Sequence, residues 1–465
     1  MALRFYNTLT RQLDTFEPLE EGRVRLYTCG PTVYHYAHIG NFRSYMFEDL
    51  LRRYLRFKGF RVTQVMNLTD VDDKTIRGAR ERGVSLNEYT QQYKDTFFED
   101  LKTLNIEPAE HYPAATDHVP EMIALIERLM EKGVAYRSDD GSVYFSIAKF
   151  PAYGRLAHLD LSGLRAGARV AQDEYEKDNV ADFALWKAWD ENDGEVAWDS
   201  PWGRGRPGWH IECSAMSMKY LGESFDIHTG GVDNMFPHHE DEIAQSEAAT
   251  GKPFVKYWLH CAHLIVDGRK MSKSLGNFFT LRDVIGRGFS GREVRYVLMA
   301  THYRQWLNFT FDTLRAARAA LDRLDEFRAR LEKTSAGAAA GPAPAWADEA
   351  LDRFAAAMDE DLNISGALGA LFDMIHAGNK ALDGGTVDAP TAGGALATLR
   401  ALDRVLGLLQ ETGETADAAA RELAALRLKA REAKNWPEAD RLRKELLALG
   451  WLVKDTPQGP ELKKA

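Results

Sequence analysis

The sequence predicts an α/β protein with a Rossmann-type catalytic domain, built on a parallel sheet and carrying an insertion. An all-α helical bundle and a small C-terminal module are expected to follow it. Three observations support this fold class. Short apolar runs alternate with amphipathic helical segments in the first half of the chain, which is typical of βαβ units. A stretch of short polar segments interrupts this alternation, and beyond about residue 292 Ala, Leu, Arg and Glu dominate.

The first βαβ unit is expected near the N-terminus. Residues 23–27 are predicted to form a strand, residues 42–57 carry apolar side chains at helical spacing, and residues 60–68 form a second β-branched run. A strand, a helix and a strand in this order predict a parallel sheet with a right-handed crossover. Such sheets bind ligands beyond the carboxyl ends of their strands, where the loops after both runs would lie.

The later elements follow from the same patterns. In the insertion, a helix is expected over residues 120–132 and a short strand over 141–146. Strand signals return at residues 225–229 and 254–266. The helical region should break at residues 334–346 and 384–394, where Gly, Pro and small residues gather, and residues 416–465 show a two-helix pattern that ends in a Pro- and Gly-containing tail.

These changes in pattern divide the chain into six expected segments. They are residues 1–112 and 200–265 for the two halves of the catalytic domain, 113–199 for an inserted connective subdomain, 266–308 for a cationic loop and the region after it, 309–412 for the helical bundle, and 413–465 for the C-terminal module.

Composition narrows the class of protein. The chain has 465 residues, 45% of them hydrophobic, and 59 Lys and Arg against 69 Asp and Glu, a net charge of −10 that argues against a general nucleic-acid coat. Charge is segregated, because residues 421–465 hold eleven basic and seven acidic residues, a charge of +4, and the rest therefore carries −14. The basic end is a candidate site for nucleic acid.

The compartment is expected to be the cytoplasm. The three cysteines, Cys29, Cys213 and Cys261, are too few and too widely spaced for a disulfide scaffold, and they indicate a reducing environment. The N-terminus lacks the apolar core of a signal peptide, and no stretch approaches the ~18 apolar residues of a membrane span. We expect a soluble protein that does not bind a membrane, with Cys261 as a buried strand residue.

Two short motifs are candidates for binding a polyphosphate. Residues 38–41 (HIGN) lie between the first strand and the first helix, where Gly40 permits close approach of the backbone and His38 can donate a hydrogen bond to a phosphate. Residues 270–274 (KMSKS) follow a strand and a turn, and their lysines and serines suit a cationic clamp. The alternative for residues 38–41 is a sequence that occurs by chance or serves packing. The alternative for residues 270–274 is a solvated basic turn.

A metal site can be argued from the residues alone. Cys29 follows the first strand, and a parallel sheet can bring it to Cys213 and to a His- and Glu-rich cluster further along the chain. Spacing i,i+4 puts His238 and Glu242 on one face of a helix, although His239 with Glu242 at i,i+3 is a rival pair. Two thiolates, one imidazole and one carboxylate suit zinc. The other interpretation is two core cysteines and a solvated helix start.

The sequence resembles a known family of proteins, and longer motifs make this resemblance specific. The pair of HIGN and KMSKS is the ATP signature of class I aminoacyl-tRNA synthetases. Four further segments narrow the match: residues 28–34 (TCGPTVY), 67–74 (NLTDVDDK), 208–216 (GWHIECSAM) and 236–242 (FPHHEDE). With these, essentially the whole chain resembles the cysteinyl-tRNA synthetase family.

The resemblance implies ATP-dependent ligation of L-cysteine to tRNA(Cys) through a cysteinyl-adenylate, by an enzyme expected to be a monomer. It implies Mg²⁺ with ATP and one Zn²⁺ per chain, held by Cys29, Cys213, His238 and Glu242. A hydrophobic pocket rejects an isostere such as serine poorly, whereas a thiophilic metal prefers the substrate thiol. No separate editing domain is therefore expected.

The remaining site residues are also implied by the resemblance. The catalytic residues would be His38, Asn41, Lys270 and Lys273. ATP and the adenylate would be bound by Gly30, Thr32, His38, Gly40, Asn41, Gly230, Gly231, Asp233 and Lys273. Cysteine would be bound by Gly30, Thr69, Trp209 and His228. The module at 413–465 would bind the anticodon of tRNA through Arg431, Lys434 and Trp436, and the region of 266–308 would hold the KMSKS loop and contact the acceptor stem.

The chain departs from the family at two points. The family usually has His-Gly-Gly-Gly where this chain has a threonine, Thr229, after His228, and a Cβ there conflicts with any backbone at positive φ. The family usually has an aromatic residue just after its Pro-Gln-Gly, whereas residues 460–465 here read PELKKA. The first departure affects an expected contact with the adenylate, and the second affects an expected contact with the anticodon.

Three other functions share some of these features. The nearest is a cysteine ligase that acts on a small amino-sugar in mycothiol synthesis, although the long helical region and its basic end favour tRNA. A catalytically inactive RNA-binding relative would not need the intact KMSKS and all four candidate ligands. A zinc hydrolase is disfavoured because the chain has no His-Glu-x-x-His pattern.

Overall fold

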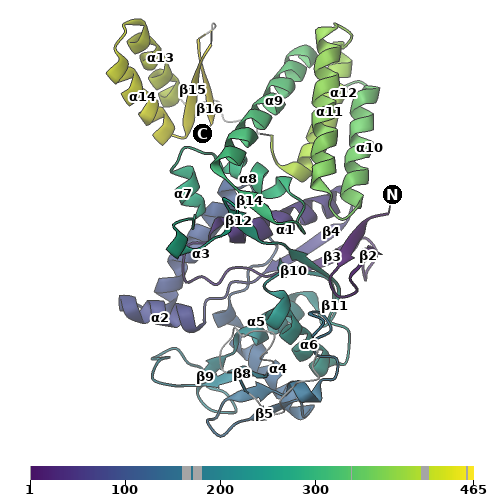
Figure 1. Ribbon diagram of the computed structural model, residues 1–465, viewed down its shortest axis with the longest axis vertical. Coiled ribbons are helices and arrows are strands. Elements are labelled where there is room, and N and C mark those ends of the chain that lie inside the picture. Colours follow the sequence, from purple (N-terminus) through teal and green to yellow (C-terminus); the bar gives the residue numbers. More distant parts are fainter. Residues whose placement is uncertain are drawn as a thin grey trace.

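The computed structural model describes residues 2–159, 169–170, 181–336, 338–409, 418–456 and 459–464. The catalytic sheet lies across the middle of the molecule (Figure 1). The insertion lies at one end, and the long helices and the C-terminal module lie at the other. The catalytic sheet, where the candidate site is expected, therefore lies between the insertion and the long helices.

The catalytic sheet is fully parallel, as predicted. Its strand order is β11–β10–β3–β4, and the strands are β3 (Arg23–Thr28), β4 (Arg61–Met66), β10 (Phe225–Gly231) and β11 (Val255–Cys261). Helix α1 (Ile39–Phe57) connects β3 to β4, and most of its residues are buried, charged ones such as Arg43 and Glu48 included. All carboxyl ends meet at one edge, where the sequence places its candidate site.

Four further helices belong to this part of the chain. They are α2 (Asp73–Arg82), α3 (Leu86–Thr103), α5 (Trp209–Leu221) and α6 (Glu240–Thr250). Of these, α5 packs on β3 and β4, α6 on α5, and α2 on α3. An N-terminal hairpin of β1 (Arg4–Asn7) and β2 (Gln12–Thr15) contacts β11 through β1. Helices α5 and α6 pack on each other, which brings the two chemistry-bearing helices together.

The insertion has a helix, α4 (Val119–Glu131), and its own sheet. The strands are β5 (Ala135–Arg137), β6 (Val143–Phe145), β7 (Arg169–Val170), β8 (Asp182–Ala188) and β9 (Gly205–Pro207). Strand β9 pairs with β8, so this sheet continues beyond residue 199.

One predicted strand, at residues 254–266, is wrong as a single element. It divides into β11 and β12 (Leu264–Val266), which belong to different sheets. Strand β12 instead lies between β13 (Arg269–Lys270) and β14 (Leu307–Phe309). Helices α7 (Leu281–Ile285) and α8 (Gly291–Ala300) follow this region. The apolar run is continuous because both strands are buried on the core side, which conceals the bend between them.

The helical region contains four long helices: α9 (Phe311–Ser335), α10 (Ala345–Asp359), α11 (Ile364–Asp383) and α12 (Ala389–Leu406). The break expected at 334–346 is confirmed. The break expected at 384–394 is shorter, because α12 begins at Ala389 with Asp388 as its N-cap and Pro390 in its first turn.

The C-terminal module has the two predicted helices, α13 (Ala418–Glu432) and α14 (Trp436–Ala448). The Pro- and Gly-containing tail forms two strands, because β15 (Trp451–Thr456) and β16 (Gly459–Lys464) form an antiparallel pair that packs on the helices. Position 413, where this module was expected to begin, and Pro457 and Gln458 lie outside the described residues.

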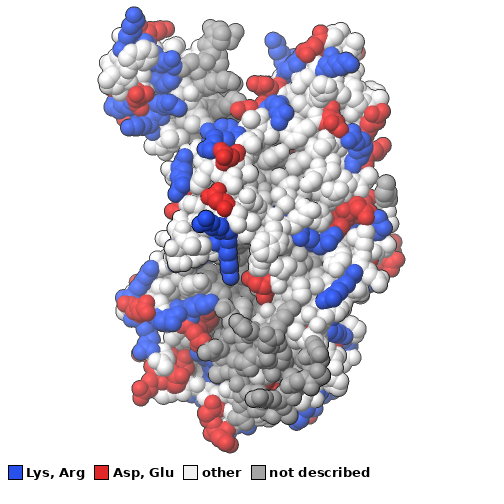
Figure 2. All heavy atoms as spheres, viewed as in Figure 1, with Lys and Arg blue, Asp and Glu red and all other residues white. Residues whose placement is uncertain are grey.

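Charge and hydropathy agree with this arrangement. Lys and Arg side chains gather on the module of α13 and α14 (Figure 2), in line with the predicted basic end. Among the described residues, no helix combines the length and the apolar character that a membrane span requires.

Candidate active site and metal centre

The candidate metal ligands meet at the carboxyl edge of the catalytic sheet. Cys29 directly follows β3, and its backbone N–H donates to the carbonyl of Thr229 on β10 (3.3 Å). Cys213 comes from α5 and Glu242 from α6. The ligand atoms of Cys29, Cys213, His238 and Glu242 all lie within 4.8 Å of one another. The structure therefore brings together four residues that are far apart in the sequence.

His238 and Glu242 are aligned as the i,i+4 spacing predicts. The Nε2 atom of His238 lies 3.1 Å from Oε1 of Glu242. A π-helical turn at Met235–His239 precedes α6, and the Phe236–Pro237 peptide bond is cis. The turn still leaves both side chains on one face.

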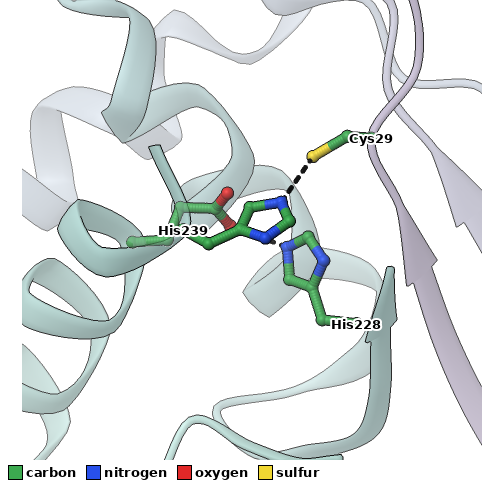
Figure 3. Close-up of side chains that lie close together, drawn as sticks. Cys29, His228 and His239 are labelled. Atoms are coloured by element: carbon green, nitrogen blue, oxygen red, sulfur yellow. Dashed lines mark hydrogen bonds and ion pairs between the residues drawn. The ribbon is translucent and has the colours of Figure 1, made fainter. Parts of the chain in front are cut away.

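A rival set of four donors shares two of these residues. The ligand atoms of Cys29, His228, His239 and Glu242 also lie within 4.8 Å of one another. The Cys29 sulfur and the two imidazole rings point toward one another (Figure 3). Nε2 of His239 is 3.2 Å from Sγ of Cys29, and Nε2 of His228 is 2.9 Å from Oε2 of Glu242. The rival pair recognised in the sequence is thus present in the fold.

The two imidazoles of the rival set differ in what holds them. Nδ1 of His239 lies 2.9 Å from Nε2 of His260, whose Nδ1 is 2.8 Å from Oγ1 of Thr8. His228 is on strand β10, and its ring stacks on Trp258 with 4.6 Å between centroids. Since the sequence motifs do not include Thr8 and His260, only the fold could identify this chain of contacts.

Burial makes this cluster electrostatically unusual. It raises the pKa of Glu242 to about 8 and lowers that of His238 to about 3. A hydrogen bond to Cys213, with burial, raises the pKa of Cys29 well above its usual range, and burial raises the pKa of Cys213. All four groups therefore favour their neutral forms until a cation arrives. A divalent metal ion would reverse this preference for the thiols and the carboxyl, so the donor set fits zinc.

The predicted cysteine pocket borders this cluster. The ring of Trp209, at the start of α5, stacks on His238 with 4.3 Å between centroids. The Thr69 hydroxyl donates to Oε2 of Glu212 (2.9 Å) and accepts from Nδ2 of Asn67 (3.2 Å). Asn67 and Glu212 were not predicted as site residues, although both lie within the motifs. Their contribution is to fix the orientation of Thr69.

Gly30 is required by a close approach of two backbones. Its N–H donates to Oδ1 of Asn67 (2.9 Å), and a Cβ at this position would lie 1.8 Å from the Asn67 carbonyl oxygen. Thr32 and Thr69 form a parallel bridge beside it. No side chain fits at residue 30 without displacing the loop after β4.

His38 and Asn41 form a capping box at the N-terminus of α1. Nδ1 of His38 accepts from the backbone N–H of Asn41 (3.2 Å), and Oδ1 of Asn41 accepts from the N–H of His38 (3.0 Å). Burial lowers the pKa of His38 to about 4. The ring is therefore neutral near pH 7 with its proton on Nε2, which leaves that nitrogen as a hydrogen-bond donor.

The HIGN and KMSKS motifs are in contact. A Cβ on Gly40 would lie 3.2 Å from Cε of Met271, and the N–H of Ile39 donates to the carbonyl of Phe279 (3.0 Å). The charge of Lys273 reaches His38, and its Nζ lies 5.3 Å from the centroid of the Phe278 ring. Two segments that are more than two hundred residues apart thus form one candidate site.

Asn277 holds the KMSKS loop, a role that the sequence did not suggest. Its Oδ1 accepts from the N–H of Ser272 (2.9 Å), and its Nδ2 donates to the carbonyl of Lys270 (3.1 Å). Ser272 and Ser274 are joined through their hydroxyls at 2.7 Å. The side chains of Lys270 and Lys273 are exposed.

The glycines expected beside the adenylate lie at the end of β10. A Cβ on Gly230 would lie 2.8 Å from the ring of His239, and one on Gly231 would lie 2.3 Å from Oδ1 of Asp233. The charge of Asp233 also acts on His38. Asp233 and Lys273 are therefore both near enough to His38 for their charges to act on its ring.

Thr229 is accommodated without a positive φ, because it lies in the extended backbone of β10. Its hydroxyl donates to Oε1 of Glu48 on α1 (3.0 Å). Glu48 is fully buried, and burial raises its pKa well above the usual range. The departure from the family pattern therefore has a specific partner in this chain.

The predicted tRNA contacts lie on the C-terminal module, away from the catalytic sheet (Figure 1). Trp436 is 56% exposed at the start of α14, and the guanidinium of Arg431 lies 5.9 Å from its ring centroid. Lys434 lies in the turn between the helices, at φ 55°. Arg431 and Trp436 are thus close enough to act on one nucleotide.

Three family models match the chain. The model of the tRNA synthetases class I (C) catalytic domain matches residues 15–319, that of the DALR domain residues 353–410, and that of the cysteinyl-tRNA ligase anticodon binding domain residues 416–460. The first covers more than half of the chain.

Curated relatives match over the full length. The chain is 54% identical over 469 residues to a cysteine–tRNA ligase of Protochlamydia amoebophila, covering 100% of this chain and 98% of that protein. It is 53% identical over 467 residues to a cysteine–tRNA ligase of Chlamydia pneumoniae, covering 99% and 98%.

Solved structures of other synthetases share the architecture. A Mycobacterium tuberculosis methionyl-tRNA synthetase in complex with methionyl-adenylate has a TM-score of 0.60 at 16% identity, covering 83% of this chain and 90% of that one. A leucyl-tRNA synthetase of Agrobacterium radiobacter K84, in a ternary complex with tRNA, has a TM-score of 0.61 at 13% identity, covering 84% and 85%. At these identities the likeness concerns the fold alone.

Proposed function

Because this chain belongs to the cysteine–tRNA ligase family of class I aminoacyl-tRNA synthetases and charges tRNA with cysteine, we propose how its site does so. One zinc ion would be held by Cys29, Cys213, His238 and Glu242, and its preference for sulfur would select the substrate thiol. The observation that carries this proposal is the meeting of these four buried donors within 4.8 Å, beside the contact between the HIGN and KMSKS motifs.

The choice of ligands rests on donor chemistry. The proposed set offers two thiolates, whereas the rival set with His228 and His239 offers one, and thiolates favour zinc over harder cations. His228 and His239 each place one ring nitrogen against a ligand, Glu242 or Cys29, which suits residues that orient ligands from the second layer.

Selection of cysteine over serine follows from this site. When bound, zinc would supply a soft Lewis acid, which has a much greater preference for a thiolate than for a hydroxyl. Trp209 and the side chain of Thr69 would then line the space for the rest of the amino acid, and Gly30 would let the backbone approach it. His228 would orient Glu242.

In the first step, the cysteine carboxylate attacks the α-phosphate of ATP, which we propose enters with Mg²⁺. This forms cysteinyl-adenylate and releases pyrophosphate. His38 would donate from Nε2 to the phosphates, and Lys273 would neutralise the charge that develops on them. Asn41 keeps His38 in the required tautomer, and Lys270 fixes the loop through its backbone contact with Asn277.

The adenylate itself would lie along the end of β10. Gly230 and Gly231 would allow close approach, Asp233 would meet the ribose side, and Gly40 and Thr32 would border the nucleotide. The absence of a Cβ at residue 230 keeps this edge clear beside His239.

In the second step, the terminal ribose hydroxyl of tRNA attacks the adenylate carbonyl and AMP leaves. Arg431, Lys434 and Trp436 would bind the anticodon loop, with Trp436 as a stacking surface. The family match at residues 416–460 supports tRNA as the acceptor over a small amino-sugar. We propose that the chain acts as a monomer, because one chain carries every residue of the proposed site. We also propose that it acts in the cytoplasm.

The expected segment limits, from residues 1–112 to residues 413–465, stay part of this proposal.

One assay tests the function: ATP–pyrophosphate exchange with cysteine, followed by charging of tRNA or of an amino-sugar. We expect ATP–pyrophosphate exchange to depend on cysteine. We also expect charging of tRNA and none of the amino-sugar. Exchange without charging of tRNA would contradict the proposed acceptor.

A further inference from the structure

The small sheet β13–β12–β14 has one buried face and one face toward solvent. Its buried face consists of Leu264, Val266, Leu307 and Phe309, all in the main core. Because side chains alternate along a strand, the residues between them point the other way. They are His263, Ile265, Trp306, Asn308 and Lys270, and Ile265 pairs with both Asn308 and Lys270. We call this set the outer face of the sheet.

The outer face carries an unusually exposed aromatic residue. Trp306 is 63% exposed, the highest fraction among the large hydrophobic side chains of the described residues. The ring of His263, which is also exposed, meets it edge-on, with 5.8 Å between centroids and 87° between planes. An edge-on neighbour leaves ring surface open for stacking, and leaving so much indole in water is unfavourable in the absence of a partner.

This face is continuous with the catalytic edge. Gly231, at the end of β10, pairs with Cys261, whose carbonyl accepts from the N–H of Val232 (2.9 Å). Two residues later, the carbonyl of His263 accepts from the N–H of Leu307, directly after Trp306 (3.1 Å). The exposed aromatic pair therefore borders the strand end where the adenylate is proposed to lie.

The charges of the outer face suit a polyanion. Arg269 and Lys270 form β13, and the KMSKS loop with Lys273 continues from it. Asp267, in the turn before β13, is the acidic residue on this turn. Cations beside an aromatic surface are the combination that binds single-stranded nucleic acid.

We propose that the outer face is a stacking platform for the unpaired 3′ end of tRNA, with Trp306 and His263 contacting bases next to the terminal nucleotide. This rests on the proposed function, since the terminal ribose must reach the adenylate at this edge of the sheet. The bases of that unpaired end are free to stack, and stacking on an aromatic side chain tolerates any base. Lys270 lies beside Ile265 in the same row and would meet the backbone phosphates.

The test compares Trp306→Ala and Trp306→Phe in the full chain. We expect Trp306→Ala to lower kcat/KM for charging of tRNA by at least about fivefold, the lower end of what stacking of one base contributes, and Trp306→Phe to keep most of it. Cysteine-dependent ATP–pyrophosphate exchange, which needs no tRNA, should remain unchanged. Trp189→Ala is the matched control, because Trp189 is 41% exposed but lies in the insertion, with the guanidinium of Arg204 5.7 Å from its ring centroid.

A second measurement identifies the occupant. Wild-type protein and Trp306→Ala should bind a tRNA that lacks its unpaired 3′ nucleotides equally well, and they should differ for intact tRNA. Normal charging of tRNA by Trp306→Ala would overturn the proposal. So would an equal loss of binding for truncated and intact tRNA, or the finding that the wild-type protein is a dimer that the substitution dissociates. Failure of the proposed function is distinct, because wild-type protein would then lack exchange with cysteine.

Discussion

The metal cluster and the KMSKS loop contrast in burial and in attachment. Glu242, Cys213 and His238 are 0%, 1% and 2% exposed, and neighbouring side chains contact them on several sides. In the KMSKS loop, the turn Lys273–Leu275 has no buried residue, and Leu275 is 57% exposed. The two regions face the same candidate site.

This difference matches two chemical tasks. Selecting a thiol over a hydroxyl needs donors held at fixed distances, which burial and hydrogen bonds provide. Holding phosphates whose charge moves during the reaction suits a loop with few attachments, which can adjust around ATP. Substitutions in the cluster should therefore change specificity, and substitutions in the loop should change rate alone.

The largest effect is expected from Cys213→Ser. Removing one thiolate should lower zinc affinity by at least about 100-fold and abolish the preference for cysteine over serine in ATP–pyrophosphate exchange. The matched control is Cys261→Ser, since Cys261 is equally buried, at the end of β11, and is not a proposed ligand. Full zinc content in Cys213→Ser, measured by metal analysis, would refute the ligand assignment.

Zinc binding should depend strongly on pH. Burial raises the pKa of Glu242 to about 8, so this carboxyl holds a proton at pH 7 in metal-free protein and must lose it on binding. Affinity should therefore rise by about tenfold or more per unit between about pH 6 and pH 8, with protons released on binding. Isothermal titration in buffers of different ionisation enthalpy measures that release.

The raised pKa of Glu242 also affects the stability of the metal-free protein. Because the folded state keeps the Glu242 proton to a higher pH than the unfolded state, the contribution of this group to stability falls as pH rises from about 4.5 to about 8. Glu242→Gln should remove this part of the pH dependence. An unchanged slope would contradict the raised pKa.

A smaller effect, on rate alone, is expected from Lys273→Ala in the loop. Loss of this charge should slow adenylate formation by at least about tenfold, or about 1.4 kcal/mol of barrier, with zinc content and melting temperature unchanged. Lys132→Ala, at an exposed position after α4, serves as the control. Normal pyrophosphate exchange in Lys273→Ala would refute the role of this lysine.

The smallest effect on activity is expected at Thr229. Thr229→Val removes the hydroxyl that donates to the buried Glu48, which should lower the free energy of unfolding by about 1–3 kcal/mol. Thr229→Ser keeps the hydroxyl and should remain close to wild type. The difference between the two denaturation midpoints is the measurement, and equal midpoints would show that the contact contributes nothing.

The sequence predicted the local features well. The parallel sheet follows from alternating apolar runs, and the His238–Glu242 pair follows from helical spacing, so both depend on near neighbours in the chain. The buried state of Cys261 was also predicted, from its position in an apolar run.

Other features depend on contacts between distant segments, which no local pattern contains. The bond between Thr229 and Glu48 joins a strand to a helix, and the chain from Thr8 through His260 to His239 joins the N-terminal hairpin to the metal cluster. The sequence showed only that the tail after α14 contains Pro and Gly residues, whereas in the fold Gly459, at φ 121°, begins the return strand of a hairpin.

The most direct test of the central claim is the ratio of cysteine- to serine-dependent ATP–pyrophosphate exchange, measured before and after zinc is removed with a chelator. If the buried cluster of Cys29, Cys213, His238 and Glu242 selects the substrate through zinc, the ratio should collapse on removal and return when zinc is added back. An unchanged ratio in metal-free protein would contradict the account.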